Sequence, residues 1–454
     1  MSKEDRTIRW CIVALAIIGL VRLLSLGAYP LMDNTESRYA EIGRVMAATG
    51  DWITPSLTDG RAFWAKPPLS TWLTAASIKA FGVNEFAARF PYFLLAIGLL
   101  LLTFSLARAL MDRTRAWLAT AILGTTALFF ICAGAVMTDM AMVLGTTLAF
   151  VGFWRCQSEE RNKLWGIAAF FGAGLSLLGK GPVGIVLLGL PIFAWCAVHR
   201  DFRPLLRLPW AAGVPVLLLT AVPWYAIAER KTPGFLNYFI VGEHIQRFIN
   251  PGWKGDLYGT AHVQPKGMIW AYGLADALPW SVVALLGAGR FFRAFRRPEV
   301  SYLVCWALTP LVFFTLSGNI LYTYVLPGLP AFAILLTLGI RRPDRAALGA
   351  VAAAVITGVL IVAGVIALNS GKLRSPSDKA LIQTAKPSES NPLLYLQEPP
   401  NSAWFYSEGK GVLHGDQPTP ETRWLASEKD LPSDLADSFE AEGKFGKKTL
   451  YRRK

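Results

Sequence analysis

The chain has 454 residues, of which 53% are hydrophobic and only 17% are charged, with a formal net charge of +14. Soluble domains have roughly 45–50% apolar and about 25% charged residues, so the composition disfavours a soluble globular protein. The 16 Trp, 26 Phe and 13 Tyr residues also supply more apolar bulk than a disordered or low-complexity chain carries. The apolar residues must therefore be concentrated in particular segments.

Eleven stretches of the sequence are apolar enough and long enough to be predicted as transmembrane helices. A helix needs about 18 or more apolar residues to cross roughly 30 Å of hydrocarbon. The stretches begin near Trp10, Phe90, Ala116, Asp139, Leu164, Val183, Trp210, Trp270, Val300, Tyr322 and Arg345. The fifth and sixth are separated only by Gly179-Lys180-Gly181-Pro182, which predicts a tight hairpin because Pro ends a helix and Gly permits the turn.

The basic residues gather in short alternate connections between these stretches. Two such connections hold Arg108, Arg113 and Arg115, and Arg200, Arg203 and Arg207. By the positive-inside rule these loops are cytoplasmic, which places the amino terminus inside and the carboxyl terminus outside. We therefore interpret the net charge as a sign of membrane topology and expect no nucleic-acid partner. The first stretch, Trp10 to Met32, is too long for a signal peptide and is expected to be a retained anchor.

Two connections on the outer side are long, about 33–89 and 229–269. The first mixes Trp and Phe with charged residues, as expected of amphipathic helices that lie in the membrane interface. Residues 371–454 are polar with short apolar runs, which predicts a small α/β domain outside the membrane; the alternative is a loosely packed tail. The predicted fold is an α-helical polytopic membrane protein with a membrane domain over 1–370 and a soluble domain over 371–454.

An acidic cluster opens the first long loop, where Asp33, Glu36 and Glu41 follow the first stretch. Placing a carboxylate near the hydrocarbon of a membrane is unfavourable in free energy, so a cluster of carboxylates there suggests a functional site. The alternative is a helix cap, in which Asp33 or Thr35 and the following carboxylates complement a helix dipole.

Further downstream, Lys66 lies between Trp64 and two prolines that fix the local backbone. A charge-assisted contact from this lysine to a phosphate would contribute roughly 1.5–3 kcal/mol. The alternative is a lysine that snorkels at the rim of the bilayer.

Two further segments on the outer side carry charge. Asp139 is a lone carboxylate at the start of the fourth stretch, for which helix capping is the simpler explanation. In the second long loop, Glu243, His244 and Arg247 lie within one helical turn and can share a face, which suits either metal ligation or anion binding.

The chain resembles a known family in several short motifs that occur in the same order. These are TESRYAEIGRVMAATGDWITPSL, FWAKPPLSTWL, FGVNEFAARFP, MTDMAMVLGTTLAF, LSLLGKGPVGIVL, EHIQRF and FFTLSGNILYTYVLPGLPA. They are similar to bacterial 4-amino-4-deoxy-L-arabinose lipid A transferase and its relatives. That group belongs to the polyprenyl-phosphate-sugar glycosyltransferases of the C superfold, which also contains the protein O-mannosyltransferases. The resemblance covers about residues 10–340.

The resemblance implies a sugar donor linked to an undecaprenyl-type monophosphate and an acidic pair at the reaction centre. Glu36 matches the Glu of the family's Asp-Glu pair, but the Asp falls on Thr35, so Asp33 is the nearest replacement. The aminoarabinose enzymes read Phe-Glu-Lys-Pro where this chain has Ala65 before Lys66. That missing Glu is a plausible metal ligand beside His244, so we expect neither a metal nor another cofactor.

Together these observations predict an inverting glycosyltransferase in the bacterial inner membrane with its active site facing the periplasm. Its donor is expected to be an undecaprenyl-phosphate-sugar and its acceptor lipid A or lipopolysaccharide; membrane lipids surround it, and we expect a monomer. The predicted catalytic residues are Asp33, Glu36 and Lys66, and the predicted substrate-binding residues are Arg38, Asp139, Lys180, Glu243, His244 and Arg247. The alternatives are a protein O-glycosyltransferase and a transporter of a lipid-linked sugar.

Overall fold

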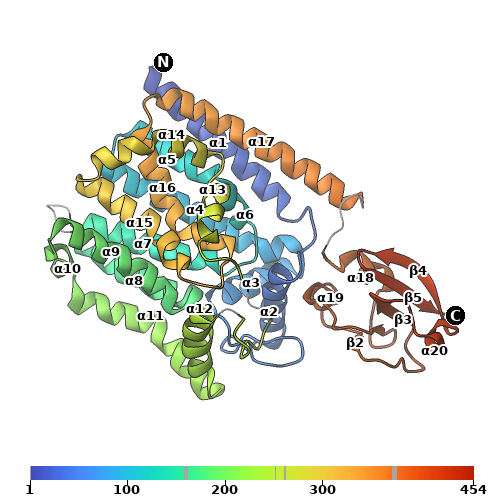
Figure 1. Cartoon of the computed structure of the whole chain (residues 1–454). Helices are drawn as coiled ribbons and strands as arrows, with labels where there is room; N and C mark the ends of the chain where they lie inside the picture. Colours follow the sequence, from blue (N-terminus) through green and yellow to red (C-terminus); the bar gives the residue numbers. More distant parts are fainter. Residues whose placement is uncertain (1, 158–161, 251, 260–261, 371–375) are drawn as a thin grey trace. The chain divides into compact units, whose positions relative to one another are not determined.

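The structure is a computed structural model (Figure 1) that describes residues 2–157, 162–250, 252–259, 262–370 and 376–454, and only the backbone of 288–293. It divides into two compact units. The first comprises 1–23, 63–70 and 92–360, and the second 24–62, 71–91 and 361–454. The second unit therefore contains both the carboxyl-terminal residues and most of the first long loop, about 33–89. The predicted boundary at 370/371 adjoins residues outside the described ranges and stays a prediction.

Helices dominate the chain up to residue 369. They are α1 (Lys3–Ser25), α2 (Thr35–Thr49), α3 (Leu69–Phe81), α4 (Glu85–Leu110), α5 (Arg113–Gly124), α6 (Ala127–Cys132), α7 (Asp139–Cys156), α8 (Lys163–Lys180), α9 (Pro182–His199), α10 (Arg203–Leu206), α11 (Trp210–Lys231), η1 (Asn237–Gln246), α12 (Arg247–Ile249), α13 (Met268–Asp276), α14 (Trp280–Ala294), α15 (Pro298–Thr315), η2 (Tyr322–Gly328), α16 (Leu329–Gly339) and α17 (Pro343–Asn369). The helix η1 is a π-helix and η2 is a 3₁₀ helix. Helices α2 and α3 occupy the first long loop, where interfacial helices are predicted.

Within the described residues, seven helical segments are long and apolar enough to cross a membrane. They are α1, α4, α9, α11, α15, η2 with α16, and α17. Helices α13 and α14 are together long and apolar enough to cross a membrane, although the chain bends by 109° at the short break between them. If this bent pair is one span, the number rises to eight. The predicted number of about eleven is not confirmed. The stretch from Ala116 breaks into α5 and α6 at Thr125 and Thr126, and α7 and α8 carry charged residues at both ends.

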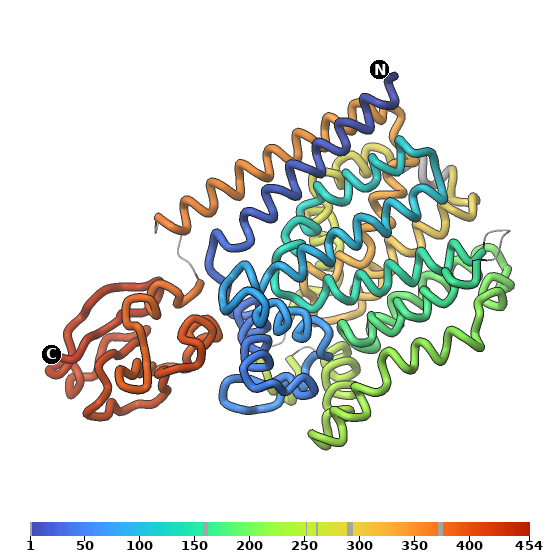
Figure 2. The backbone as a smooth tube through the Cα atoms, turned by 180° about the vertical axis from the view of Figure 1, so that it is seen from behind, coloured from blue at the N-terminus to red at the C-terminus, as the bar shows by residue number. Residues whose placement is uncertain are grey.

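Helix α8 packs between α7 and α11, and both views show these three helices side by side (Figures 1 and 2). Glycines allow the close approach of α7 and α8: a Cβ on Gly172 would lie 2.5 Å from the carbonyl oxygen of Gly145. The predicted hairpin between α8 and α9 is confirmed, with Gly181 at a φ of +92°. The close packing brings the start of α7, at Asp139, beside the end of α8, at Lys180.

The hydrophobic core of the first unit contains a cluster of buried aromatic rings. Phe150 stacks on Trp306 with ring centroids 4.1 Å apart, and the hydroxyl of Tyr302 donates to the carbonyl oxygen of Phe150 over 2.8 Å. These residues join α7 to α15. The core therefore supports the middle of α7, whose first residue is Asp139.

The carboxyl-terminal part of the second unit is a small α/β fold. Its sheet has the strand order β2-β1-β3-β5-β4, with β1 parallel to β2 and β3, and β5 antiparallel to β3 and β4. The elements are α18 (Lys379–Ala385), β1 (Leu393–Tyr395), α19 (Asn401–Tyr406), β2 (Val412–His414), β3 (Trp424–Ser427), α20 (Ser433–Ala436), β4 (Phe439–Phe445) and β5 (Lys448–Arg453). Leu381, Tyr395 and Leu450 are fully buried in its core, so the alternative of a loose tail is wrong.

We expect Gly172→Ala to destabilise the protein, because its methyl group would overlap the backbone of α7. Overpacking of this kind costs roughly 1–3 kcal/mol. Gly189 in α9 has no atom within 4 Å of an added Cβ, so Gly189→Ala is the matched control and is expected to stabilise slightly, by about 0.5–1 kcal/mol. Thermal unfolding of both purified variants in detergent tests this, and equal unfolding temperatures would contradict the account of the α7–α8 contact.

Candidate functional site

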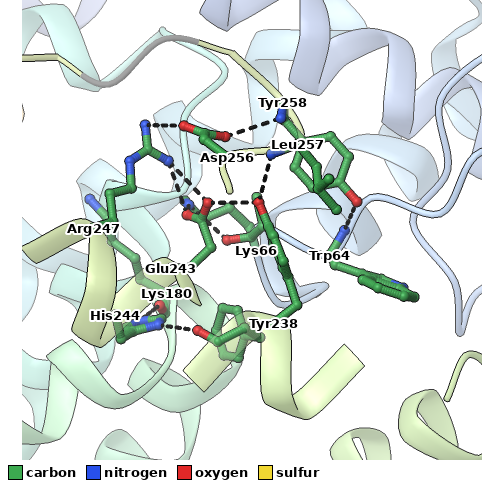
Figure 3. A network of polar contacts seen from close by, with 12 residues as sticks. Trp64, Lys66, Lys180, Tyr238, Glu243, His244, Arg247, Asp256, Leu257 and Tyr258 are labelled. Carbon is green, nitrogen blue, oxygen red and sulfur yellow. Dashed lines mark hydrogen bonds and ion pairs between the residues drawn. The ribbon is translucent and has the colours of Figure 1, made fainter. Parts of the chain in front are cut away.

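Lys66, Glu243 and Arg247 form one buried ion-pair cluster in the first unit (Figure 3). The Nζ atom of Lys66 donates to Glu243 Oε2 over 3.0 Å and to the carbonyl oxygen of Ala65 over 2.7 Å. Nη1 of Arg247 lies 3.1 Å from each carboxylate oxygen of Glu243. The side chain of Glu243 is only 2% exposed. These contacts do not fit a lysine that snorkels toward water.

The local helix explains part of this arrangement. Glu243 and Arg247 are four residues apart at the junction of η1 and α12, so their side chains meet on one face, as the sequence predicts. His244 does not share that face. Its Nδ1 lies 2.8 Å from the carbonyl oxygen of Phe239 and its Nε2 lies 3.2 Å from that of Lys180. Only Glu243 and Arg247 therefore share the predicted face, and the substrate-binding role of His244 stays a prediction.

A second group of residues, which the sequence did not single out, holds the cluster in place. The hydroxyl of Tyr238 donates to Glu243 over 3.3 Å and accepts from the backbone N–H of Leu257 over 3.1 Å. Asp256 pairs with Arg247 at 3.4 Å. These residues lie near or within the irregular part of the second long loop, where no periodicity or motif marks them.

The hydroxyl of Tyr258 binds the backbone two residues before Lys66. It accepts the N–H of Trp64 over 3.0 Å, and the indole N–H of Trp64 donates to Thr232 over 3.2 Å. The backbone on both sides of Lys66 is therefore restrained, by the hydrogen bond at Trp64 and by the two prolines that follow Lys66. This restraint orients the Lys66 side chain toward Glu243.

The electrostatics of the cluster keep Glu243 ionised. Burial raises the pKa of Glu243, but the charges of Lys66 and Arg247 more than offset it and hold the pKa below its usual value. Burial lowers the pKa of His244 below its usual value, and the charge of Lys66 acts in the same direction. With Asp256 paired to Arg247, two carboxylates balance the two cations of the cluster, so an anionic ligand would have to bind to Lys66 or Arg247 directly.

The geometry around His244 does not fit a metal site. Both ring nitrogens face backbone carbonyl oxygens, so the unprotonated nitrogen, whichever it is, does not direct its lone pair toward an ion. Over the described ranges, no group of three His, Cys, Asp or Glu side chains is placed to hold a metal. Ala65 supplies no ligand beside Lys66.

We expect the purified protein to contain no stoichiometric zinc, manganese or other transition metal, and to unfold at the same temperature with and without a chelator. Elemental analysis of the detergent-purified protein measures the metal content directly. One equivalent of metal in the wild type that is lost in His244→Ala would show that His244 rotates to become a ligand.

Asp139 and Lys180 form a second buried ion pair, with 2.5 Å between Oδ1 and Nζ. The ammonium group of Lys180 also lies 4.5 Å from the ring centroid of Tyr324. The capping explanation for Asp139 is wrong, because Thr138 is the N-cap residue of α7 and makes no side-chain cap hydrogen bond. The carbonyl group of Lys180 faces His244, which links this pair to η1.

Glu36 belongs to the second unit and forms a bidentate pair with Arg89. Nε and Nη2 of Arg89 donate to the two carboxylate oxygens over 2.7 and 2.9 Å. Arg89 also donates to the carbonyl oxygens of Leu26, Tyr29 and Pro30 and is fully buried. Arg89 is not among the predicted site residues, although an arginine directly before the apolar stretch that begins near Phe90 is a usable signal.

Asp33 also lies in the second unit, where it contacts residues of the carboxyl-terminal fold. Its carboxylate accepts the backbone N–H of Ser402 over 3.0 Å and the hydroxyl groups of Ser402 and Ser37. Burial and the nearby charge of Asp378 raise the pKa of Asp33, and these hydrogen bonds offset part of the rise. Capping of α2 by Asp33 or Thr35 is wrong, because Asn34 is the N-cap residue and makes no side-chain cap hydrogen bond.

The predicted site residues therefore divide between the two units. Lys66, Asp139, Lys180, Glu243, His244 and Arg247 belong to the first unit, and Asp33, Glu36 and Arg38 to the second. Arg38 is half-buried on α2. The structure groups the first set into the Lys66–Glu243–Arg247 cluster and the Asp139–Lys180 pair, which His244 links. It ties the two carboxylates of the second set to Arg89 and Ser402.

Comparison with known proteins identifies the family. Residues 11–239, just over half of the 454-residue chain, match the family model described as dolichyl-phosphate-mannose-protein mannosyltransferase, or PMT. The chain belongs to this PMT family. Two relatives carry the name undecaprenyl phosphate-alpha-4-amino-4-deoxy-L-arabinose arabinosyl transferase. The protein from Shewanella sediminis is 29% identical over 78% of this chain, and that from Erwinia tasmaniensis is 33% identical over 72%.

This PMT-family chain spans only 65% and 59% of the lengths of those two relatives. Among solved structures, it is similar to ArnT from Cupriavidus metallidurans bound to undecaprenyl phosphate. The TM-score is 0.79, the identity is 21%, and the match covers 97% of both chains. The match confirms the predicted fold class, a mostly helical protein with a small carboxyl-terminal α/β domain. The chain is a multi-pass integral membrane protein.

Proposed function

We propose that this chain is an integral-membrane glycosyltransferase that moves a sugar from undecaprenyl-phosphate-sugar to lipid A or lipopolysaccharide. The observation that carries the proposal is the convergence of Lys66 and Arg247 on one buried carboxylate. The names of the relatives and the undecaprenyl phosphate bound to the similar ArnT structure support the choice of donor. The basic alternate connections support a bacterial inner-membrane protein whose long loops face the periplasm.

In this proposal Lys66 and Arg247 bind the donor phosphate. A phosphate oxygen accepts charge-assisted hydrogen bonds from an ammonium or guanidinium group, each worth roughly 1.5–3 kcal/mol. Glu243 reduces the repulsion between the two cations and fixes the direction in which each points. The donor phosphodiester then meets a preorganised site, so little of the binding free energy is lost in ordering side chains.

The reaction we propose is a single displacement with inversion. The acceptor oxygen attacks the anomeric carbon while the bond from that carbon to the phosphate oxygen breaks, and undecaprenyl phosphate leaves with the electron pair. Negative charge grows on the leaving phosphate, and Lys66 and Arg247 stabilise it there. If the acceptor is a phosphate of lipid A, it is already anionic and needs no general base. Glu36, which pairs with Arg89 in the second unit, stays a predicted catalytic residue.

A protein acceptor is the second candidate, because the matching family model is described as a protein mannosyltransferase. Vesicles that contain the purified protein, a radiolabelled undecaprenyl-phosphate-sugar, lipid A and a periplasmic protein extract separate the possibilities. Label on lipid A supports the proposal. Label on protein favours the second candidate, and donor that only crosses the bilayer would indicate a transporter and overturn both.

We expect Lys66→Ala to lower kcat/KM for the donor by about 10- to 100-fold, because the loss of one charge-assisted phosphate contact costs roughly 1.5–3 kcal/mol. Lys254→Ala removes an exposed lysine from the second long loop and serves as the control. Initial rates in the vesicle assay, normalised to folded protein, measure both variants. Equal loss in the two variants would mean that general surface charge, and not Lys66, attracts the donor.

A further inference from the structure

The segment between α1 and α2 makes two polar contacts with helix α19 within the second unit. At the start of α19, the carboxylate of Asp33 binds the backbone N–H and the hydroxyl group of Ser402. At the end of α19, the hydroxyl of Tyr406 accepts the N–H of Leu31 over 2.7 Å and donates to Glu85 over 2.9 Å. Both ends of this short helix are therefore held by the segment that follows α1, and its end also by the first residue of α4.

Ser402 connects Asp33 to the interior of the carboxyl-terminal fold. Its side chain is fully buried, and its hydroxyl oxygen accepts the N–H of Asp378 over 2.9 Å. Asp378 in turn accepts from the hydroxyl of Tyr395 over 2.9 Å and pairs with Lys448 at 3.1 Å. A continuous hydrogen-bonded path thus runs from Asp33 to strands β1 and β5.

The backbone of Asp33 adds to the same contact, since its N–H donates to the carbonyl oxygen of Pro376 over 3.0 Å. Lys379, three residues after Pro376, pairs with Glu85. The charged and titratable groups around Asp33 and Glu85 are therefore Asp378, Lys379, Tyr395 and Tyr406, all from the carboxyl-terminal fold.

We propose that Asp33 is the docking residue of the carboxyl-terminal domain, and that it acts through Ser402 and not as the base of the reaction. A carboxylate suits this role because it only accepts hydrogen bonds, and three donors from Ser37 and Ser402 converge on it. An amide in its place would direct an N–H group at one of these donors. The docking itself is independent of the function proposed above.

The consequence for turnover does rest on that proposed function. Helix α2 begins at Thr35, and it carries Glu36 and Arg38 one turn after Asp33. Release of Ser402 would free the segment that leads into α2 and change the position of Glu36. Asp33 is thus a positioning residue, and the carboxyl-terminal domain is a part of the enzyme that aligns the start of α2.

Hydrogen–deuterium exchange of the full-length protein measures the docking without any substrate. We expect Asp33→Asn, Ser402→Ala and Glu85→Gln each to speed exchange of the α19 amides about tenfold, the effect of losing one buried hydrogen bond. The double variant Asp33→Asn/Ser402→Ala should exchange no faster than the stronger single variant, because both changes break one contact. Ser433→Ala, an exposed serine of the same domain, is the control and should match the wild type.

Transfer rates of the same variants separate docking from base catalysis. If Asp33 acts through Ser402, then Ser402→Ala and Glu85→Gln lower kcat along with Asp33→Asn. If Asp33 is a base, Asp33→Asn alone lowers kcat by about 10²–10⁴ while α19 exchanges as in the wild type, and the proposal is overturned. Should Ser402→Ala fail to fold, Glu85→Gln makes the same comparison. A wild type with no transfer activity would refute the proposed function and leave the exchange result to decide on docking.

Discussion

The pairing of Glu243 with Lys66 and Arg247 is the interaction on which the arrangement of the site depends. Burial of a carboxylate is strongly unfavourable to folding unless cations and hydrogen-bond donors surround it. Removing one partner of such a buried pair typically lowers the free energy of unfolding by about 3–5 kcal/mol. Lys66 lies 177 residues away from Glu243 in sequence, so their pairing ties the first long loop to η1. His244, next to Glu243, then binds the end of α8 through the carbonyl of Lys180 and brings the Asp139 pair into the same framework.

The need of a buried charge for a partner distant in sequence decides what the sequence could and could not predict. Apolar length identifies the seven membrane-length helical segments of the described residues, and Gly181-Pro182 predicts the α8–α9 hairpin, because both signals are properties of one segment by itself. Partners are different: Glu36 and Arg89 are 53 residues apart, and Asp139 and Lys180 are 41 apart. The sequence therefore presents each charge as single, with capping or snorkelling as its simplest explanation. The breaks at Thr125–Thr126 and between α13 and α14 were also missed, because a broken stretch is as apolar as a continuous one.

Three carboxylates of this PMT-family chain have different partners. Glu243 pairs with Lys66 and Arg247, Glu36 pairs with Arg89, and Asp33 accepts hydrogen bonds from Ser402. Thr35 and Ala65 carry no charge, but each is followed directly by a charged residue, Glu36 or Lys66. Lys66 and Arg247 bring two cations to one buried carboxylate.

The most direct test of this account is the affinity of the purified protein for undecaprenyl phosphate compared with uncharged undecaprenol, measured by native mass spectrometry or fluorescence titration in the same detergent. The account predicts that the wild type binds the phosphate-bearing lipid at least about tenfold more tightly, as expected for one or more charge-assisted contacts. It also predicts that Lys66→Ala combined with Arg247→Ala abolishes this preference. Equal affinities for the two lipids in the wild type, or an unchanged preference in the double variant, would contradict it.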